Sequence, residues 1–419
     1  MYQNKRIVVT GMGTINAIAN DIPEFVRALA KGSCGIREID LFDTTGYRCR
    51  KGGQIRNFLP RSFIPEEFPL KSLKRMSRAD LLAFAATLEA LRDAGLYPLP
   101  EAMKEDMGVA IGGGSGGLLE GESFYGDLLQ KGSKKAHFSR LSSVYCASST
   151  DRIATYLGLL GPKITLMTAC SSGATVLGYG RDLIRNGQAS IMLAGGVEPM
   201  CRITYASFNA LKSLDPDVCR PFDRHRGGLS LGEAAAVMVL ETLESALARG
   251  ARIYGEILGY GVTCDAHHMT SPDAQASGAI RAMQAALKDS GLGPEDIDYI
   301  NAHGTATTVN DVMETKAIKE VFGRRAYAVP VSSSKAMTAH TLGASGALEG
   351  IVSLVALAHG FMPPTINYRD PDPHCDLDYI TEGARPATLR AVLSNSFAFG
   401  GNNTTVIFGK SPHGSAGHA

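Results

Sequence analysis

The chain has 419 residues, 44% of them hydrophobic and 20% charged, which is enough for a large core and excludes a mostly disordered chain. Its 42 basic and 41 acidic side chains give a net charge of +1, without the basic excess of a nucleic-acid-binding protein. Any charged partner must therefore be bound by a local patch.

No segment is apolar over the length that a membrane span needs; the stretch at residues 351–358, for example, is too short. The start of the chain is typical of a first strand rather than of a signal peptide. The eight cysteines are irregularly spaced and form no CxxC pair, which argues against a zinc site or a disulfide framework. We therefore expect no bound metal, reduced thiols and a cytoplasmic protein.

Strand-like apolar runs alternate with helical patterns along the chain, which predicts an α/β fold. The strands are expected at residues 6–10, 108–111, 164–167, 191–194, 235–240, 326–331 and 404–408. The helices are expected at residues 79–94, 171–186, 277–290 and 342–359. Residues 412–419 are expected to form a disordered tail.

Two short motifs recur in the same order in both parts of the sequence. LRDAGL (91–96) and LKDSGL (287–292) each end a helix and precede a strand that runs into glycine. Met-Thr-Ala-Cys170 recurs as Met-Thr-Ala-His340, each time between a strand and a small-residue helix. We therefore expect two similar halves, residues 1–253 and 254–411, with one reactive side chain from each at corresponding helix starts.

Cys170 follows an apolar strand and opens the helix that begins SSGATVLGYG. Unpaired backbone N–H groups and the positive end of the dipole at a helix start favour the thiolate and can hold an oxyanion. An inert core cysteine is the usual alternative, but the position and the repeat favour a nucleophile.

Two histidines occupy comparable positions in the second half. His303 follows a strand in the motif NAHGTAT, which is typical of a site that hydrogen-bonds a polar ligand, and His340 begins the helix equivalent to that of Cys170. A helix start favours the neutral imidazole. Either histidine alone would more often be structural, but the pair beside a candidate cysteine indicates a reaction site.

Two further features accompany the histidines. Lys335 and Glu349 lie in apolar or small-residue segments, where a buried ion pair could hold the histidines in orientation. The motif NSFAFGGNN (395–403) places phenylalanines beside paired glycines, which indicates a mobile gate with a backbone donor, or a plain turn.

Five motifs together resemble the β-ketoacyl-acyl carrier protein synthases, and synthase II in particular. They are TACSSGA (168–174), RPFDRHRGG…GEAAAVMVLE (220–241), NAHGTATTVND (301–311), SSSKAMTAHTLGASGALE (332–349) and SNSFAFGGNN (394–403). The resemblance extends from residue 5 to about residue 410. It implies a thiolase-like fold with two duplicated α/β halves in a five-layered αβαβα core, usually as a dimer.

The resemblance also implies a role for each catalytic candidate. Cys170 would take an acyl chain from an acyl carrier protein, and His303 and His340 would hold the carbonyl of a malonyl thioester. Lys335, together with Glu349, would support His303.

Other positions would hold the substrate, according to the same resemblance. Thr305 and Thr307 would contact the phosphopantetheine arm that the carrier brings, so no metal or organic cofactor of its own is required. Phe399 would be the gate, and the backbone N–H groups of Cys170 and Phe399 would form the oxyanion hole. Lys71, Lys74, Arg75 and Arg78 form a basic run that enters the helix predicted at 79–94, where the family docks its carrier.

Four positions depart from the family pattern. Ala339 and Ala398 stand where the family usually has glycine, and Asn402 stands where it has threonine. Ser115 occupies a position where housekeeping enzymes often have a branched apolar residue at the floor of the acyl pocket. These departures leave the expected chemistry intact and leave the substrate open.

The resulting hypothesis is decarboxylative Claisen condensation of malonyl-carrier with an acyl group on Cys170, in fatty-acid elongation. The alternative is the catalytic ketosynthase subunit of a specialised type II polyketide or polyene pathway, paired with a chain-length-setting subunit. A homodimer and a heterodimer with a homologous subunit are both expected possibilities. A non-catalytic partner subunit is disfavoured because Cys170, both histidines and Lys335 are all present, and a thiolase because it lacks this Cys-His-His pattern and uses free coenzyme A.

Overall fold

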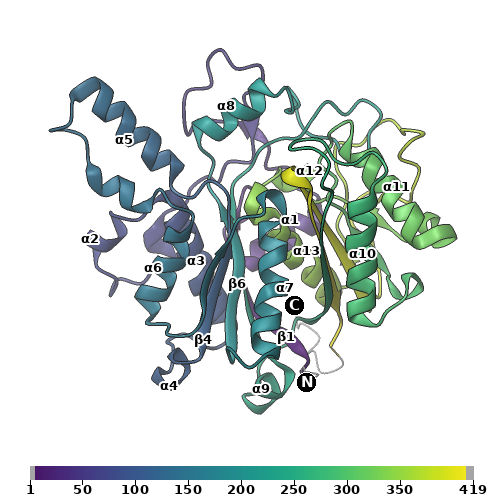
Figure 1. Ribbon diagram of the computed structural model, residues 1–419, viewed down its shortest axis with the longest axis horizontal. Coiled ribbons are helices and arrows are strands. Elements are labelled where there is room, and N and C mark those ends of the chain that lie inside the picture. Colours follow the sequence, from purple (N-terminus) through teal and green to yellow (C-terminus); the bar gives the residue numbers. More distant parts are fainter. Residues whose placement is uncertain (1–4, 412–419) are drawn as a thin grey trace.

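Two groups of five strands form the centre of the molecule (Figure 1). The computed structural model describes residues 5–411, and the tail predicted at residues 412–419 lies outside them. The N-terminal group consists of β1 (Ile7–Asn16), β4 (Met107–Gly112), β5 (Lys163–Leu166), β6 (Ile191–Glu198) and β7 (Ala234–Thr242). The C-terminal group consists of β8 (Gly255–Cys264), β9 (Tyr299–Asn301), β10 (Val331–Ser332), β13 (Ala391–Ala398) and β14 (Asn402–Gly409).

The two groups have the same topology. The strand order is β5-β4-β6-β7-β1 in the first group and β10-β9-β13-β14-β8 in the second. In each group the first three strands run parallel, and the remaining two pairings are antiparallel. β1 pairs with β8 only at Val8–Glu256 and Val9–Gly255, which joins the groups into one ten-stranded sheet. The matching order and directions confirm the predicted duplication.

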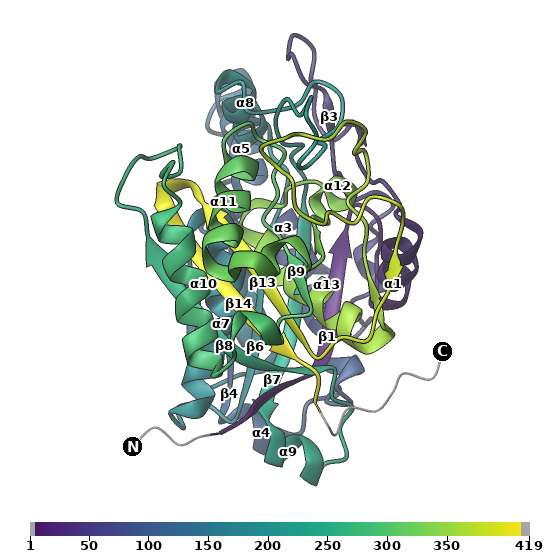
Figure 2. The same cartoon turned by 90° about the vertical axis from the view of Figure 1, so that its right-hand side faces the viewer.

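Helices cover both groups of strands in layers (Figures 1 and 2). The central layer is α7 (Ser172–Arg185) and α13 (Ser345–His359), which pack on each other and on β6 and β13. The outer layers are α3 (Arg78–Asp93) with α6 (Ala147–Leu157) on the N-terminal strands, and α10 (Ser277–Ser290) with α11 (Asn310–Phe322) on the C-terminal side. This is the five-layered αβαβα arrangement of the thiolase-like fold.

The remaining elements are short or peripheral. The helices are α1 (Ile22–Lys31), α2 (Leu70–Leu73), α4 (Glu101–Lys104), α5 (Leu118–Lys131), α8 (Arg202–Ala210), α9 (Leu243–Ala248) and α12 (Lys335–Thr338). Two small antiparallel pairs are formed by β2 (Arg37–Glu38) with β3 (Lys51–Gly52) and by β11 (Phe361–Met362) with β12 (Arg385–Pro386). α5 projects from the body of the molecule, at the left of Figure 1.

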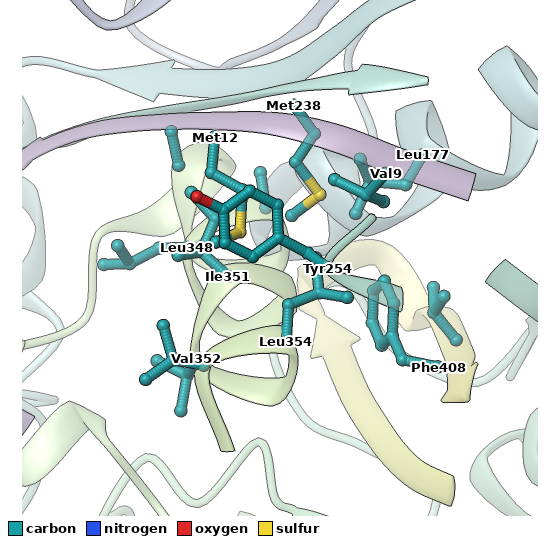
Figure 3. Packing of buried hydrophobic residues seen from close by; sticks show 14 of the residues in the cluster. Val9, Met12, Leu177, Met238, Tyr254, Leu348, Ile351, Val352, Leu354 and Phe408 are labelled. Atoms are coloured by element: carbon teal, nitrogen blue, oxygen red, sulfur yellow. The ribbon is translucent and has the colours of Figure 1, made fainter. Parts of the chain in front are cut away.

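α13 is the most deeply buried helix of the central layer. Its apolar side chains pack between the strands of both halves: Figure 3 shows Leu348, Ile351 and Leu354 in one cluster with Met12 and Met238 of the first half and Phe408 of the second. Within residues 5–411, the stretch Leu342–His359 is the one helical segment long and apolar enough to cross a membrane, but 83% of it is buried inside the protein. Its apolar composition is therefore that of a core helix.

The predicted helices agree well with the structure, and the strands agree less well. The strand expected at residues 326–331 is wrong: Gly323–Tyr327 forms a 3-10 helix, η5, and β10 comprises only Val331–Ser332. β8 was not predicted because glycines interrupt its apolar pattern. A Cβ at Gly261 would lie 2.2 Å from the Ala282 carbonyl oxygen, so this glycine allows α10 to approach the strand.

Candidate active site

Cys170 lies between β5 and α7, in the short 3-10 helix η3 (Ala169–Ser171). The residue before it, Ala169, has a φ of +51°, and the residue before His340, Ala339, has a φ of +64°. Positive φ values are uncommon for alanine because of its Cβ. The repeated Met-Thr-Ala motif thus ends in an alanine with a positive φ in both halves.

The Cys170 thiol is buried, and burial raises its pKa to about 12. The charge of Lys335 and the backbone N–H of Phe399, which donates toward the sulfur, oppose this rise. The sequence favours a thiolate at a helix start, but the loss of hydration outweighs these favourable groups. The thiol therefore has to lose its proton in the course of the reaction rather than before it.

His303 is held by its backbone at the end of β9. The N–H groups of His303 and Gly304 each donate to one carboxylate oxygen of Glu314 in α11, both at 2.8 Å. Burial, with smaller contributions from Lys335 and His340, holds the pKa of His303 well below its usual value, so the ring is neutral. Its Nδ1 is buried and has no partner within the described chain, which is uncommon for a purely structural histidine.

His340 faces His303, with the two ring centroids 5.3 Å apart and the rings nearly perpendicular at 85°. Its Nδ1 accepts the N–H of Leu342 at 3.2 Å, so the proton of the neutral ring belongs on Nε2. The 3-10 helix η6 (Leu342–Ala344) separates His340 from α13, so this residue does not begin the helix as the sequence predicts. The pKa of His340 is nevertheless well below its usual value, because of burial and the charge of Lys335.

Lys335 and Glu349 form a buried ion pair behind the histidines, as the sequence predicts. Lys335 begins α12 and Glu349 lies in α13. Burial raises the pKa of Glu349 to about 7, although Lys335 opposes the rise. The positive charge of Lys335 disfavours protonation of both histidines and attracts negative charge on Cys170.

A cavity of about 300 Å³ brings the predicted reactive groups together. Its walls include Cys170, His303, His340, Thr305, Thr307 and Phe399. The hydroxyl oxygens of Thr305 and Thr307 are 3.0 Å apart. Lys335 and Glu349 are not among the lining residues and act from behind them.

Phe399 covers one side of the cavity. Its ring stacks on Phe208 of α8 at a centroid distance of 5.8 Å and an angle of 11°. The turn that follows is tied to a second loop, because Gly400 donates its N–H to the Met269 carbonyl at 2.7 Å and Gly401 accepts the N–H of Asp265 at 2.9 Å. Phe208 was missed in the sequence, since it lies in an ordinary helical pattern.

Ser115 lies outside the described cavity lining. Its side chain is buried, with the hydroxyl 3.3 Å from the Thr204 hydroxyl, and its N–H donates to Glu198 at 2.6 Å. The pocket-floor role of Ser115 therefore stays a prediction.

Two buried carboxylates that the sequence reasoning missed hold the loops around the cavity. Glu314 fixes the His303 loop, and burial raises its pKa to about 7. Glu198, at the end of β6, accepts N–H groups from Gly114 in the first half and Gly343 in the second, both at 2.9 Å. An acidic residue inside an apolar strand or helix pattern is the sequence signal that could have indicated them.

The four cations of the basic run before α3 have two different environments in the structure. Lys71, Lys74 and Arg75 are exposed, as a docking surface requires. Arg78 instead forms an ion pair with the buried Glu233, with an N–O distance of 2.6 Å. The Arg78 guanidinium thus neutralises an interior carboxylate, and its role in docking stays a prediction.

Residues 5–411 contain no group of three or more His, Cys, Asp or Glu side chains arranged to hold an ion.

Two family models match the chain in the order of its halves. "Beta-ketoacyl synthase, N-terminal domain" matches residues 4–246, and "Beta-ketoacyl synthase, C-terminal domain" matches residues 254–369. The chain belongs to the β-ketoacyl synthase family.

Relatives of this β-ketoacyl synthase are similar over nearly their whole length. The 3-oxoacyl-[acyl-carrier-protein] synthase 2 of Synechocystis is 42% identical, covering 97% of this chain and 99% of the relative. The enzyme of the same name from Staphylococcus aureus is 39% identical, covering 98% and 99%. These similarities place the synthase among the acyl-transferring condensing enzymes.

Solved structures give the same fold. The ishigamide ketosynthase/chain length factor has a TM-score of 0.92 at 39% identity and covers 97% of this synthase and 99% of that chain. A type II polyketide ketosynthase in complex with its acyl-carrier protein has a TM-score of 0.87 at 30% identity, covering 97% and 100%.

Proposed function

We propose that this β-ketoacyl synthase condenses malonyl-carrier with an acyl group held on Cys170, with loss of carbon dioxide, in fatty-acid elongation. The observation that carries this proposal is one cavity lined by a cysteine and two neutral histidines, with the charge of Lys335 behind them. No metal and no cofactor of its own is needed, since the carrier brings the phosphopantetheine arm.

In the first step, Cys170 sulfur attacks the carbonyl of the acyl-carrier thioester. The oxyanion that forms is stabilised by the backbone N–H groups of Cys170 and Phe399. The carrier thiol then leaves with the proton that Cys170 has lost, and the acyl group remains on the enzyme. Thr305 and Thr307, which line the cavity, would contact the phosphopantetheine arm.

In the second step, malonyl-carrier loses its carboxylate and becomes an enolate. Neutral His303 and His340 each have one N–H to donate to the thioester oxygen, and this donation strengthens as negative charge develops. The enolate carbon attacks the acyl carbonyl, and the Cys170 thiolate leaves next to the positive charge of Lys335.

Acylation of Cys170 is testable by intact mass spectrometry. After incubation with acyl-carrier protein, the wild-type mass should increase by one acyl group, and Cys170→Ala should show no increase. Cys264→Ala, which removes an exposed thiol, is the matched control and should acylate normally. Undiminished acylation of the Cys170→Ala variant would contradict the proposal.

A specialised polyketide or polyene pathway is the second candidate. It is favoured by the similarity to a ketosynthase/chain length factor at 39% identity, nearly the level of the synthase 2 relatives. Under either reading the partners are an acidic acyl carrier protein, bound at Lys71, Lys74 and Arg75, and a second subunit.

The free cysteines and the buried position of α13 support a cytoplasmic site of action.

A further inference from the structure

Two cysteines outside the reaction cavity lie on one edge of α12. The Cys219 thiol donates to the carbonyl of Lys335 at 3.3 Å, and the Cys34 thiol approaches the carbonyl of Ala336 at 3.8 Å. These carbonyls belong to consecutive residues of a single helical turn. The two thiols therefore contact adjacent carbonyls of the helix that begins with Lys335.

The apolar cluster around these thiols includes residues of both catalytic loops. Cys34 and Cys219 pack with Ala306, which lies between Thr305 and Thr307, and with Ala339, which precedes His340. Burial raises the pKa of Cys219 to about 12, and the nearby Cys34 adds to the rise, which is a second sign of their proximity.

The two thiols differ in their access to solvent. Cys34 is half-buried in the loop that follows α1, whereas Cys219 is buried. A small reagent can therefore reach Cys34 first, and Cys219 can react only with a sulfur that is already bound at Cys34.

Cys219 is connected to the catalytic residues by hydrogen bonds. Its N–H donates to the Ser230 hydroxyl at 3.0 Å, and the carbonyl of Ser230 accepts the N–H of His340 at 2.7 Å. Asn367 donates to the carbonyls of Cys219 and Ala336 at 3.1 and 3.3 Å. A displacement of Cys219 is thus transmitted to His340 and to α12.

We propose that Cys34 and Cys219 form a reversible disulfide by exchange with a low-molecular-weight disulfide, and that this bond lowers the condensing activity. The shift that brings the two sulfur atoms to bonding distance pulls on α12 and on the Ser230–His340 contact. A site held in productive geometry by such contacts loses about 100-fold in rate for a displacement of about 1 Å.

The exchange is balanced in two steps. The Cys34 thiolate attacks one sulfur of the small disulfide and forms a mixed disulfide with it, while the other sulfur leaves as a thiolate and takes up the Cys34 proton. The Cys219 thiolate then attacks the Cys34 sulfur and expels the second small thiol, which takes up the Cys219 proton. The two protein thiols are oxidised by two electrons, and the disulfide reagent is reduced to two thiols.

Cross-linking is tested on the full-length protein with oxidised glutathione, followed by blocking of free thiols and peptide mass mapping. A Cys34–Cys219 linked peptide that disappears after dithiothreitol is the expected result. Glutathione adducts at the exposed Cys264 without a linked peptide would overturn the proposal. This readout does not depend on the proposed function.

The predicted loss of activity assumes that the proposed function is correct. It is tested by measuring the rate of condensation before and after oxidation of the protein. Oxidised wild-type protein should lose about 100-fold and recover with dithiothreitol, whereas Cys34→Ser should start at the wild-type rate and keep it. If oxidation inactivates Cys34→Ser as strongly as the wild type, the loss comes from another thiol, such as Cys170. The proposed link between the Cys34–Cys219 disulfide and the condensation rate would then be wrong. A linked peptide without loss of rate would overturn it as well. If reduced wild-type protein does not condense malonyl-carrier, the proposed function fails, and the linked peptide still decides whether the disulfide forms.

Discussion

At position 339 the backbone has φ +64° and ψ 178°, a combination that is nearly restricted to glycine. Position 398, the other alanine where related synthases usually have glycine, has an ordinary extended backbone with φ −128° and ψ 156°. Ala339 therefore stores backbone strain beside His340, and Ala398 stores none.

Replacing each alanine by glycine should reveal this difference. For Ala398→Gly the free energy of unfolding should fall by about 0.5–1 kcal/mol, because glycine gains more freedom in the unfolded chain. For Ala339→Gly, relief of about 1–3 kcal/mol of strain should offset that cost and the roughly 0.8 kcal/mol lost with a buried methyl group. Urea unfolding measures both variants, and equal destabilisation of the two would show that Ala339 is not strained.

The raised pKa of Cys170 predicts a pH dependence for its alkylation. Because only the thiolate reacts and burial raises the pKa to about 12, the rate with iodoacetamide should rise about tenfold per pH unit from pH 7 to 9. Peptide mapping assigns the rate to Cys170, with Cys170→Ala as the blank. A rate that begins to level off between pH 8 and 9 would mean that the thiol ionises as readily as an exposed one, whose pKa is about 8.5.

At the scale of elements, the cations between α2 and the start of α3 fall into two groups, one exposed to solvent and one paired with a buried carboxylate. Exposed Lys74 and Arg75 face solvent, while Arg78 compensates the interior charge of Glu233. In the sequence these cations form one basic run. They differ only in the structure, where Lys74 and Arg75 are exposed and Arg78 contacts a buried carboxylate.

Charge reversal should therefore have different effects within the run. Lys74→Glu with Arg75→Glu should raise KM for acyl-carrier substrates at low salt, with a weaker effect at high salt and an unchanged Tm. Arg78→Glu should instead destabilise the fold by about 3–5 kcal/mol, because it leaves Glu233 buried without a partner. An unchanged KM for the double variant at low salt would argue against docking at α2.

For the whole molecule, the two halves come into close contact where α7 crosses α13. A Cβ at Gly173 would lie 2.6 Å from the backbone nitrogen of Ala347, and one at Gly346 would lie 2.4 Å from that of Ala174. This close crossing brings Cys170, which lies just before α7, to the cavity that is also lined by His340.

The edge of the sheet predicts how subunits associate. β5 (Lys163–Leu166) is an edge strand. Leu160 lies shortly before it and Met167 directly after it, and their side chains are 76% and 66% exposed. An uncovered edge with apolar flanks favours pairing with another chain. Leu160→Glu with Met167→Glu should convert a dimer to a folded monomer in light scattering, whereas Leu247→Glu on α9 should not. If the Leu160→Glu, Met167→Glu double variant keeps the same mass in solution as the wild type and the Leu247→Glu control, the dimer does not form through β5.

The sequence by itself determined the α/β class, the duplication, and the candidates Cys170, His303, His340 and Lys335, because these depend on local periodicity and on motifs at strand ends. Tertiary structure reversed the expected ionisation of Cys170 and supplied the physical cause of the neutral histidines, since burial and the charge of Lys335 depend on residues distant in the sequence. It also decided the separation of Arg78 from its neighbours. Long-range partners determine such properties. The sequence motifs indicated the Lys335–Glu349 pair, but no local pattern indicated that Arg78 pairs with Glu233, which is 155 residues away.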